Sequence, residues 1–129
     1  IMAPELSQKG LTIAEFELTV NSENQNPLFK LVLTQAGKQD QFLKGEVSLK
    51  LHGLLNGKLA EFDFRELGTF QTKHFQFQFK YFHNIEGEII LPENFIADHV
   101  AIVAKTRGLQ HNQSAEKEIN WKLLLGSNI

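Results

Sequence analysis

Between residues 73 and 82 the chain alternates aromatic and polar side chains, and this alternation restricts the fold more than any other feature of the sequence. Aromatic rings stand at Phe75, Phe77, Phe79 and Tyr81, with polar residues between them. A β-strand points alternate side chains to opposite faces, so one set enters a core and the other faces water. Rings of this size need an opposing apolar layer, and we therefore expect this strand at the centre of a β-sandwich.

Length and composition favour a single β-rich domain. The chain has 129 residues, 11 of them Phe, and 42% of its residues are hydrophobic. Aromatic and β-branched residues favour strands, and a chain of this length buries roughly two-thirds of its unfolded surface. We expect one β-sandwich domain over residues 1–129.

Charge and cysteine content exclude several classes of function. The formal net charge is −2, and the 13 Lys and Arg residues are dispersed, so the basic footprint of a nucleic-acid binder is missing. The absence of Cys excludes disulfides, thiolate metal sites and Cys nucleophiles. No apolar run approaches the ~20 residues that span a bilayer.

Eight segments have the composition of strands, separated by turn residues as in a sandwich or barrel. The longest candidate for a helical turn is Glu93–Asp98, and less than about 15% of the chain is expected to be helical. The predicted fold class is all-β, an antiparallel β-sandwich of about eight strands. The expected strands are 11–20, 28–35, 43–54, 58–66, 73–82, 85–91, 99–106 and 117–125.

Asn56-Gly57 predicts a hairpin, because both residues tolerate the positive φ of a type I′ turn. A two-residue loop places Leu51 opposite Phe62 and Lys50 opposite Asp63. Both pairs are compatible, whereas a slip of one residue would set apolar side chains against charged ones.

A second hairpin is expected after the aromatic segment, with a three-residue loop that ends at Asn84 in the left-handed region. This register pairs Tyr81 with Ile85. It also places Phe79 over Gly87, where the missing side chain leaves room for a ring.

The core is expected to include inward residues of several strands and the single Trp. These residues are Val47, Leu49, Leu51, Phe62, Phe64, Phe75, Phe77, Phe79 and Trp121.

The histidines do not have the spacing of a metal site on strands, which would place ligands at i and i+2. They are His52, His74, His83, His99 and His111. In the predicted hairpin His52 lies opposite Glu61, an ion-pair partner. We interpret all five as structural or surface residues and expect no metal and no cofactor.

Catalytic constellations are also missing. No Ser lies in a G-x-S-x-G context, and no Gly-rich phosphate loop is present. The pairs Glu15/Glu17 and Glu86/Glu88 each share a sheet face, an arrangement that glycosidases use when two acids face each other. We interpret them as solvated positions of amphipathic strands and predict no catalytic residue.

Apolar residues in turns are the candidate binding site. Leu54 and Leu55 lie at the tip of the Asn56-Gly57 hairpin, and Phe82 lies in the next turn. Apolar residues in turns gain little from their own core, so a contiguous patch of them would mark a partner site.

A run near the middle of the chain, FKYFHNIEGEIILP, resembles a proteobacterial family of unknown function. The departures from its pattern are His83 in place of Gln, and Asn94 and Ala97 in place of Gly and Pro. The segments that carry the resemblance are 79–92, Phe95, Val100, 29–35, 45–53 and 119–121.

The resemblance implies a cellular setting but no activity. Members of the family are inner-membrane proteins with one N-terminal transmembrane helix, a coiled coil and this domain at the C-terminus, and some are encoded near bactofilin-type cytoskeletal proteins. It implies that this chain is the periplasmic end of a longer anchored protein, with protein partners in the cell envelope. Contact with the membrane would come through a segment absent from this chain, and oligomers through the coiled coil.

Three functions stay open. The preferred one is a non-enzymatic interaction or assembly module. A carbohydrate- or peptidoglycan-binding sandwich would need exposed rings on one concave face, with amides such as Gln76 and Gln78 beside them. A small hydrolase would need His and carboxylate side chains clustered in a pocket.

Overall fold

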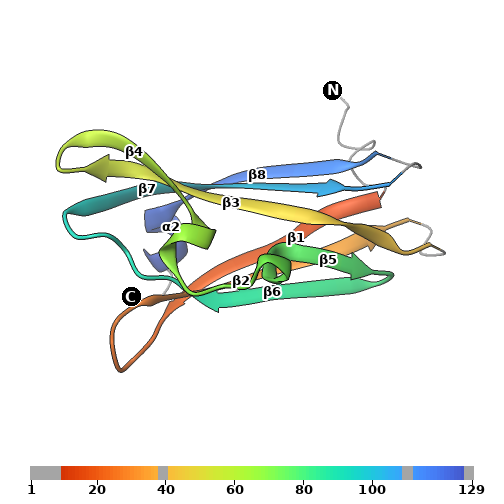
Figure 1. Cartoon of the computed structure of the whole chain (residues 1–129), viewed down its shortest axis with the longest axis horizontal. Helices are drawn as coiled ribbons and strands as arrows, with labels where there is room; N and C mark the ends of the chain where they lie inside the picture. Colours follow the sequence, from red (N-terminus) through yellow and green to blue (C-terminus); the bar gives the residue numbers. More distant parts are fainter. Residues whose placement is uncertain (1–9, 38–40, 109–111, 127–129) are drawn as a thin grey trace.

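The computed structural model describes residues 10–37, 41–108 and 112–126. Within these residues eight strands form two antiparallel sheets that pack as a β-sandwich, with 64% strand and 12% helix (Figure 1), so the expected fold class is confirmed. Sheet A has the order β1-β2-β6, and sheet B has the order β4-β3-β7-β8 with β5 on the β4 side of β3. The strands are β1 (Gly10–Val20), β2 (Pro27–Ala36), β3 (Leu43–Leu55), β4 (Lys58–Asp63), β5 (Gln76–Phe79), β6 (Phe82–Glu88), β7 (Phe95–Thr106) and β8 (Ser114–Asn120).

Short helices connect or follow the strands. Two 3₁₀ helices, η1 (Phe64–Leu67) and η2 (Thr72–Phe75), connect β4 to β5, and α2 (Trp121–Gly126) follows β8. The side chain of Asp63 accepts a hydrogen bond from the N–H of Arg65 and so caps η1.

Strand β3 organises sheet B because it pairs along both of its edges. One edge pairs with β7 over nearly its whole length. The other edge is divided, with β4 on Lys50–Leu55 and β5 on Leu43–Glu46. The outer face of β3 therefore lies at the centre of a continuous surface.

The core lies between the sheets and is rich in Phe. The ring of Phe29, from sheet A, meets the ring of Phe64 edge-on at a centroid distance of 5.1 Å and stacks on Phe75 at 6.3 Å. The predicted core residues are buried, except that Phe62 is half-buried and packs edge-on against Phe95. Tyr81 does not continue the inward row, since 57% of it is exposed.

The Asn56-Gly57 hairpin is confirmed to the residue. Leu51 pairs with Phe62 and Lys50 with Asp63. Asn56 and Gly57 have φ of 53° and 84°. Because the turn type sets the register, the local sequence was sufficient to predict how β3 pairs with β4.

The second expected hairpin is wrong. After β5 the chain crosses from sheet B to sheet A, so β5 pairs with β3 and β6 pairs with β2. Tyr81 therefore does not face Ile85, and Asn84 is a strand residue opposite Val32. Crossing lets Phe79 and Ile85 enter the same core from opposite sheets, which a hairpin within one sheet would prevent. Gly87 does leave room for a ring, but the space is taken by the rings of Phe70 and Phe29 and not by that of Phe79.

Three further expectations about elements are wrong. Residues 73–75 are in η2 and not in a strand. The segment Glu93–Asp98 is not a helical turn, because β7 begins at Phe95 and pairs with β3 as far as the hairpin tip. The last strand ends at Asn120, whose side-chain Oδ1 accepts from the N–H groups of Lys122 and Leu123 and starts α2.

Candidate functional site

An apolar row crosses three strands on the outer face of sheet B, at the hairpin end. Leu54 of β3 pairs with Leu59 of β4 and with Ile96 of β7. Their exposed fractions are 38%, 90% and 69%. Single exposed apolar residues are ordinary, but a contiguous row marks an interaction site. We call these three residues the apolar row.

A second row of ionisable side chains lies next to it. His52 of β3 faces Glu61 of β4 and His99 of β7. The two imidazole rings stack at a centroid distance of 4.5 Å, 5° from parallel. Glu61 approaches His52 Nδ1 at 3.9 Å and Lys50 Nζ at 3.3 Å. The expected pairing of His52 with Glu61 is thus confirmed.

A β-bulge in β7 shapes this row. The register between β3 and β7 shifts between His52 and Gly53, where β7 has the additional residue Asp98. The Asp98 carboxylate lies 2.8 Å from His99 Nδ1. Bulges often re-aim side chains beside functional sites, and this one orients the ring of His99.

Residues of both rows line a shallow hollow of about 520 Å³. Its lining includes the imidazoles, the leucines of the apolar row and both carboxylates. Such a surface offers apolar contact beside hydrogen-bonding groups, which is typical of interfaces. Within the described residues no group of three His, Asp or Glu side chains could hold a metal ion.

The predicted site residues do not come together. Leu54 belongs to the apolar row. Leu55 points to the other side of the sheet, beside Phe95, and is half-buried. Phe82 is 64% exposed but begins β6 at the opposite end of the sandwich (Figure 1).

Sequence reasoning missed two members of the apolar row and one of the imidazoles. Leu59 could have been found, because the hairpin register already places it opposite Leu54. Ile96 and His99 reach the site through the pairing of β7 with β3, which connects distant parts of the chain. No local pattern reports that pairing.

The remaining histidines are dispersed. His74 Nε2 donates to the carbonyl of Glu86. His83 lies near the rings of Phe77 and Phe79, and burial lowers its pKa. His111 lies outside the described residues.

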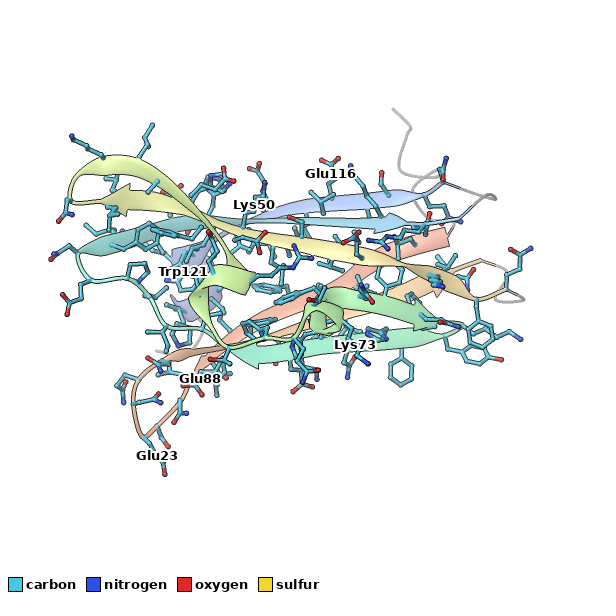
Figure 2. The ribbon with its side chains drawn as sticks, viewed as in Figure 1. Glu23, Lys50, Lys73, Glu88, Glu116 and Trp121 are labelled. Carbon is cyan, nitrogen blue, oxygen red and sulfur yellow. The ribbon has the colours of Figure 1, made fainter. Side chains whose placement is uncertain are left out.

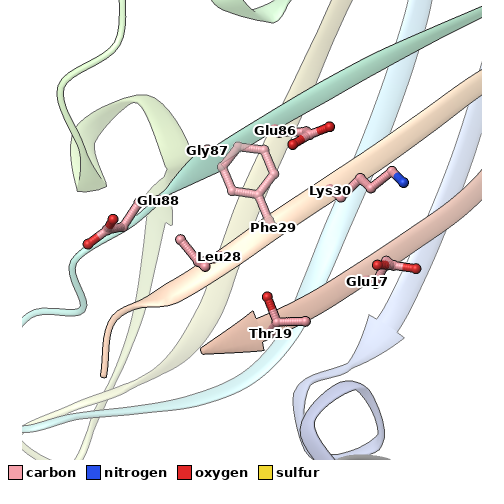
Figure 3. Close-up of a pocket in the computed structure, with 8 residues that line it drawn as sticks. All are labelled: Glu17, Thr19, Leu28, Phe29, Lys30, Glu86, Gly87 and Glu88. Atoms are coloured by element: carbon pink, nitrogen blue, oxygen red, sulfur yellow. The ribbon is translucent and has the colours of Figure 1, made fainter. Parts of the chain in front are cut away.

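A second hollow lies on sheet A and is lined by three of the four carboxylates of the predicted pairs (Figure 3). Lys30 of β2 lies between Glu17 of β1 and Glu86 of β6 in one cross-strand row. Glu15 and Glu17 are exposed, and a hydrogen bond between them raises the pKa of Glu17. The expected alternation of solvated carboxylates is confirmed for β1.

Glu88, at the rim of this hollow, has a structural role. Its carboxylate accepts hydrogen bonds from the side-chain amides of Asn26 at 2.8 Å, Asn24 at 2.9 Å and Asn21 at 3.2 Å. These amides lower the pKa of Glu88. The carboxylate thereby fastens the β1–β2 loop, where Glu23 lies, to the end of β6 (Figure 2).

Comparison with known proteins adds a family but no activity. The model of a family of unknown function (DUF6776) matches residues 1–102. No curated protein and no solved structure matches the chain. In the part of the chain that the structure describes, no helix is long and apolar enough to cross a membrane.

Proposed function

This chain belongs to DUF6776, a family of unknown function, and we propose that it is a non-enzymatic protein-interaction module that binds through the outer face of sheet B. The observation that carries the proposal is the apolar row, which leaves Leu59 and Ile96 mostly exposed on the two strands that flank β3. Burying this row against a partner would remove apolar surface from water. No such gain is available within the domain.

The surroundings of the apolar row indicate the chemistry of the partner. The stacked imidazoles and the carboxylates of Glu61 and Asp98 border it on one side. A partner segment could place an apolar side chain on the apolar row. A neighbouring Lys, Arg or backbone N–H of the same segment could then donate to the carboxylates. Hot spots of this kind have an apolar centre and a polar rim.

The cellular setting is also a proposal, supported by the resemblance of residues 79–92. We propose a periplasmic domain of an envelope protein that is anchored in the inner membrane and carries a coiled coil. Tethering would raise the effective concentration of the domain for partners on the same membrane. Weak binding through a small surface would then be sufficient.

The test is recovery of partners from envelope extract with the whole chain as bait. Ile96→Ser combined with Leu59→Ser should leave the melting temperature nearly unchanged and remove partners that the unmodified chain retains. The matched control is Ile90→Ser, since Ile90 is 61% exposed and lies outside the apolar row. Partners retained by the double variant, or lost equally in the control, would show that the apolar row is not the binding surface.

A further inference from the structure

Three aromatic side chains are exposed at the end of the sandwich opposite the β3–β4 hairpin. The exposed fractions are 64% for Phe42, 57% for Tyr81 and 64% for Phe82. Phe42 directly precedes β3, and Tyr81 joins β5 to β6. We call these residues the aromatic end.

A buried amide holds the aromatic end together. Gln35 is 5% exposed, and its Nε2 donates to the carbonyl of Gln41 at 2.9 Å and to the carbonyl of Lys80 at 2.8 Å. Each of these carbonyls belongs to the residue just before an exposed ring, so one side chain fixes both segments. The rings of Phe42 and Tyr81 therefore project from a rigid base.

Basic residues lie close to two of these rings in the chain. Lys80 Nζ lies 5.9 Å from the centroid of the Tyr81 ring. Lys44 follows Phe42 by two residues, and its carbonyl accepts from the N–H of Arg107 at 2.7 Å. Among the described residues, no carboxylate forms an ion pair with Lys44 or Lys80.

The two ends of the sandwich differ in charge. Among the described residues at the aromatic end, the acidic residue is Glu46, which is ion-paired with Arg65 and Arg107. The residues counted at this end are 10–12, 34–37, 41–46, 78–83, 105–108 and 112–114. The basic ones there are Lys44, Lys80, Lys105 and Arg107. The opposite end carries Glu23, Glu88, Glu93 and Asp98 against the basic residues Lys58 and Lys122, and Figure 2 shows Glu23 and Glu88 together there.

We propose that the aromatic end docks onto the surface of an anionic lipid bilayer. Aromatic rings favour the membrane–water interface, and nearby Lys and Arg are attracted to anionic headgroups. A protein partner would need a fitted pocket for each ring and a carboxylate for each cation. A bilayer supplies apolar depth and negative charge without such fitting. The acidic groups of the other end would point away from the bilayer and leave the apolar row accessible.

The test is co-sedimentation of the whole chain with vesicles of phosphatidylcholine alone and of equimolar phosphatidylcholine and phosphatidylglycerol. We expect binding to the mixed vesicles, weakened by salt. Phe42→Ser with Phe82→Ser should reduce partitioning by about tenfold or more. Lys44→Gln and Lys80→Gln should each reduce it about fivefold. Ile90→Ser, at a 61% exposed residue just beyond the other end of β6, is the control and should bind as the unmodified chain does.

Several results would overturn the proposal. These are no binding to the mixed vesicles, equal binding to neutral vesicles, or equal loss in the Ile90→Ser control. Retention on a protein or on peptidoglycan without vesicle binding would also reject it. If the double Phe variant melts early, the two Lys variants decide the result, because neither Lys is buried and no described carboxylate forms an ion pair with either.

A fluorescent reporter gives an independent readout. Phe82→Trp places an indole at the aromatic end, while Trp121, 6% exposed, contributes a constant buried background. The emission of the new indole should shift to shorter wavelength on mixed vesicles and be quenched by brominated lipid. An unchanged spectrum would place position 82 in water and reject the docking orientation.

Discussion

At Gly57 the backbone has a φ of 84°, and no atom lies within 4 Å of the position that a Cβ would occupy. The cost of a side chain there is therefore a cost of backbone conformation alone. Gly57→Val should lower the free energy of unfolding by roughly 1–2 kcal/mol, because a β-branched residue resists this region. Chemical denaturation measures the change. Gly57→Asn should cost less, since Asn tolerates the left-handed region, and equal losses in the two variants would contradict the argument.

Glu88 shows how one carboxylate can order a loop. The side chains of Asn21, Asn24 and Asn26 all donate to it. Two of these residues also form local turns, in which the Oδ1 of Asn21 accepts from the N–H of Glu23 and the Oδ1 of Asn24 accepts from the N–H of Asn26. The amides prefer the ionised carboxylate, and this preference lowers its pKa.

The lowered pKa predicts a pH dependence of stability. The contribution of Glu88 is fully present above the ordinary pKa of 4.5 and is lost as pH falls through the lower value of the folded state. The unmodified chain should therefore melt at a higher temperature than Glu88→Gln at neutral pH. The difference should shrink in acid below pH 4.5. A difference that stays constant across this range would show that the carboxylate charge is not what holds the loop.

At the scale of elements, the connection between β4 and β5 protects the free edge of β6. His74 donates to the carbonyl of Glu86 there, and the N–H of Ile90 donates to the carbonyl of Leu67 at 2.7 Å. The ring of Phe70 lies over Gly87, where a Cβ would come within 2.5 Å of it. Covering an edge in this way prevents pairing with another chain.

The close approach at Gly87 can be tested by substitution. Gly87→Ala should lower the free energy of unfolding by about 1–3 kcal/mol, because the methyl group must displace the ring of Phe70. In a Phe70→Leu background the same change should cost less. A double-mutant cycle in denaturant measures this coupling. Additive losses would show that Phe70 does not cover Gly87 in solution.

At the scale of the whole molecule, both sheets depend on one shared core. Phe77 is 2% exposed and lies 5.7 Å from the Phe79 ring. Its ring also occupies space beside Gly45 of the central strand, since its Cζ would lie 2.7 Å from a Cβ there. Phe77→Ala should cost roughly 3–5 kcal/mol in a single unfolding transition. A loss below about 1 kcal/mol in a denaturant melt would be too small for a ring filling the core.

Local sequence determined the inward and outward faces of most strands and the register of one hairpin. Alternation in β3 placed Leu51 inside and His52 outside, and the turn at Asn56-Gly57 aligned β4. Both features depend on residues close together in the chain, whose geometry follows from the period of a strand and from φ. The same alternation separates Leu54 from Leu55, although both had been assigned to one binding surface.

Tertiary structure decided which strands became neighbours. The pairing of β7 with β3 brings Ile96 to Leu54 and His99 to His52. The crossing after Phe79 brings Lys80 to Gln35 of sheet A, whose amide also holds Gln41 and so places Phe42 and Tyr81 at one end. No local pattern encodes these neighbours, because they form only when two sheets bury their apolar faces against each other at once. The candidate surfaces arise at that step, since the residues left outside the shared core are known only when the core is complete.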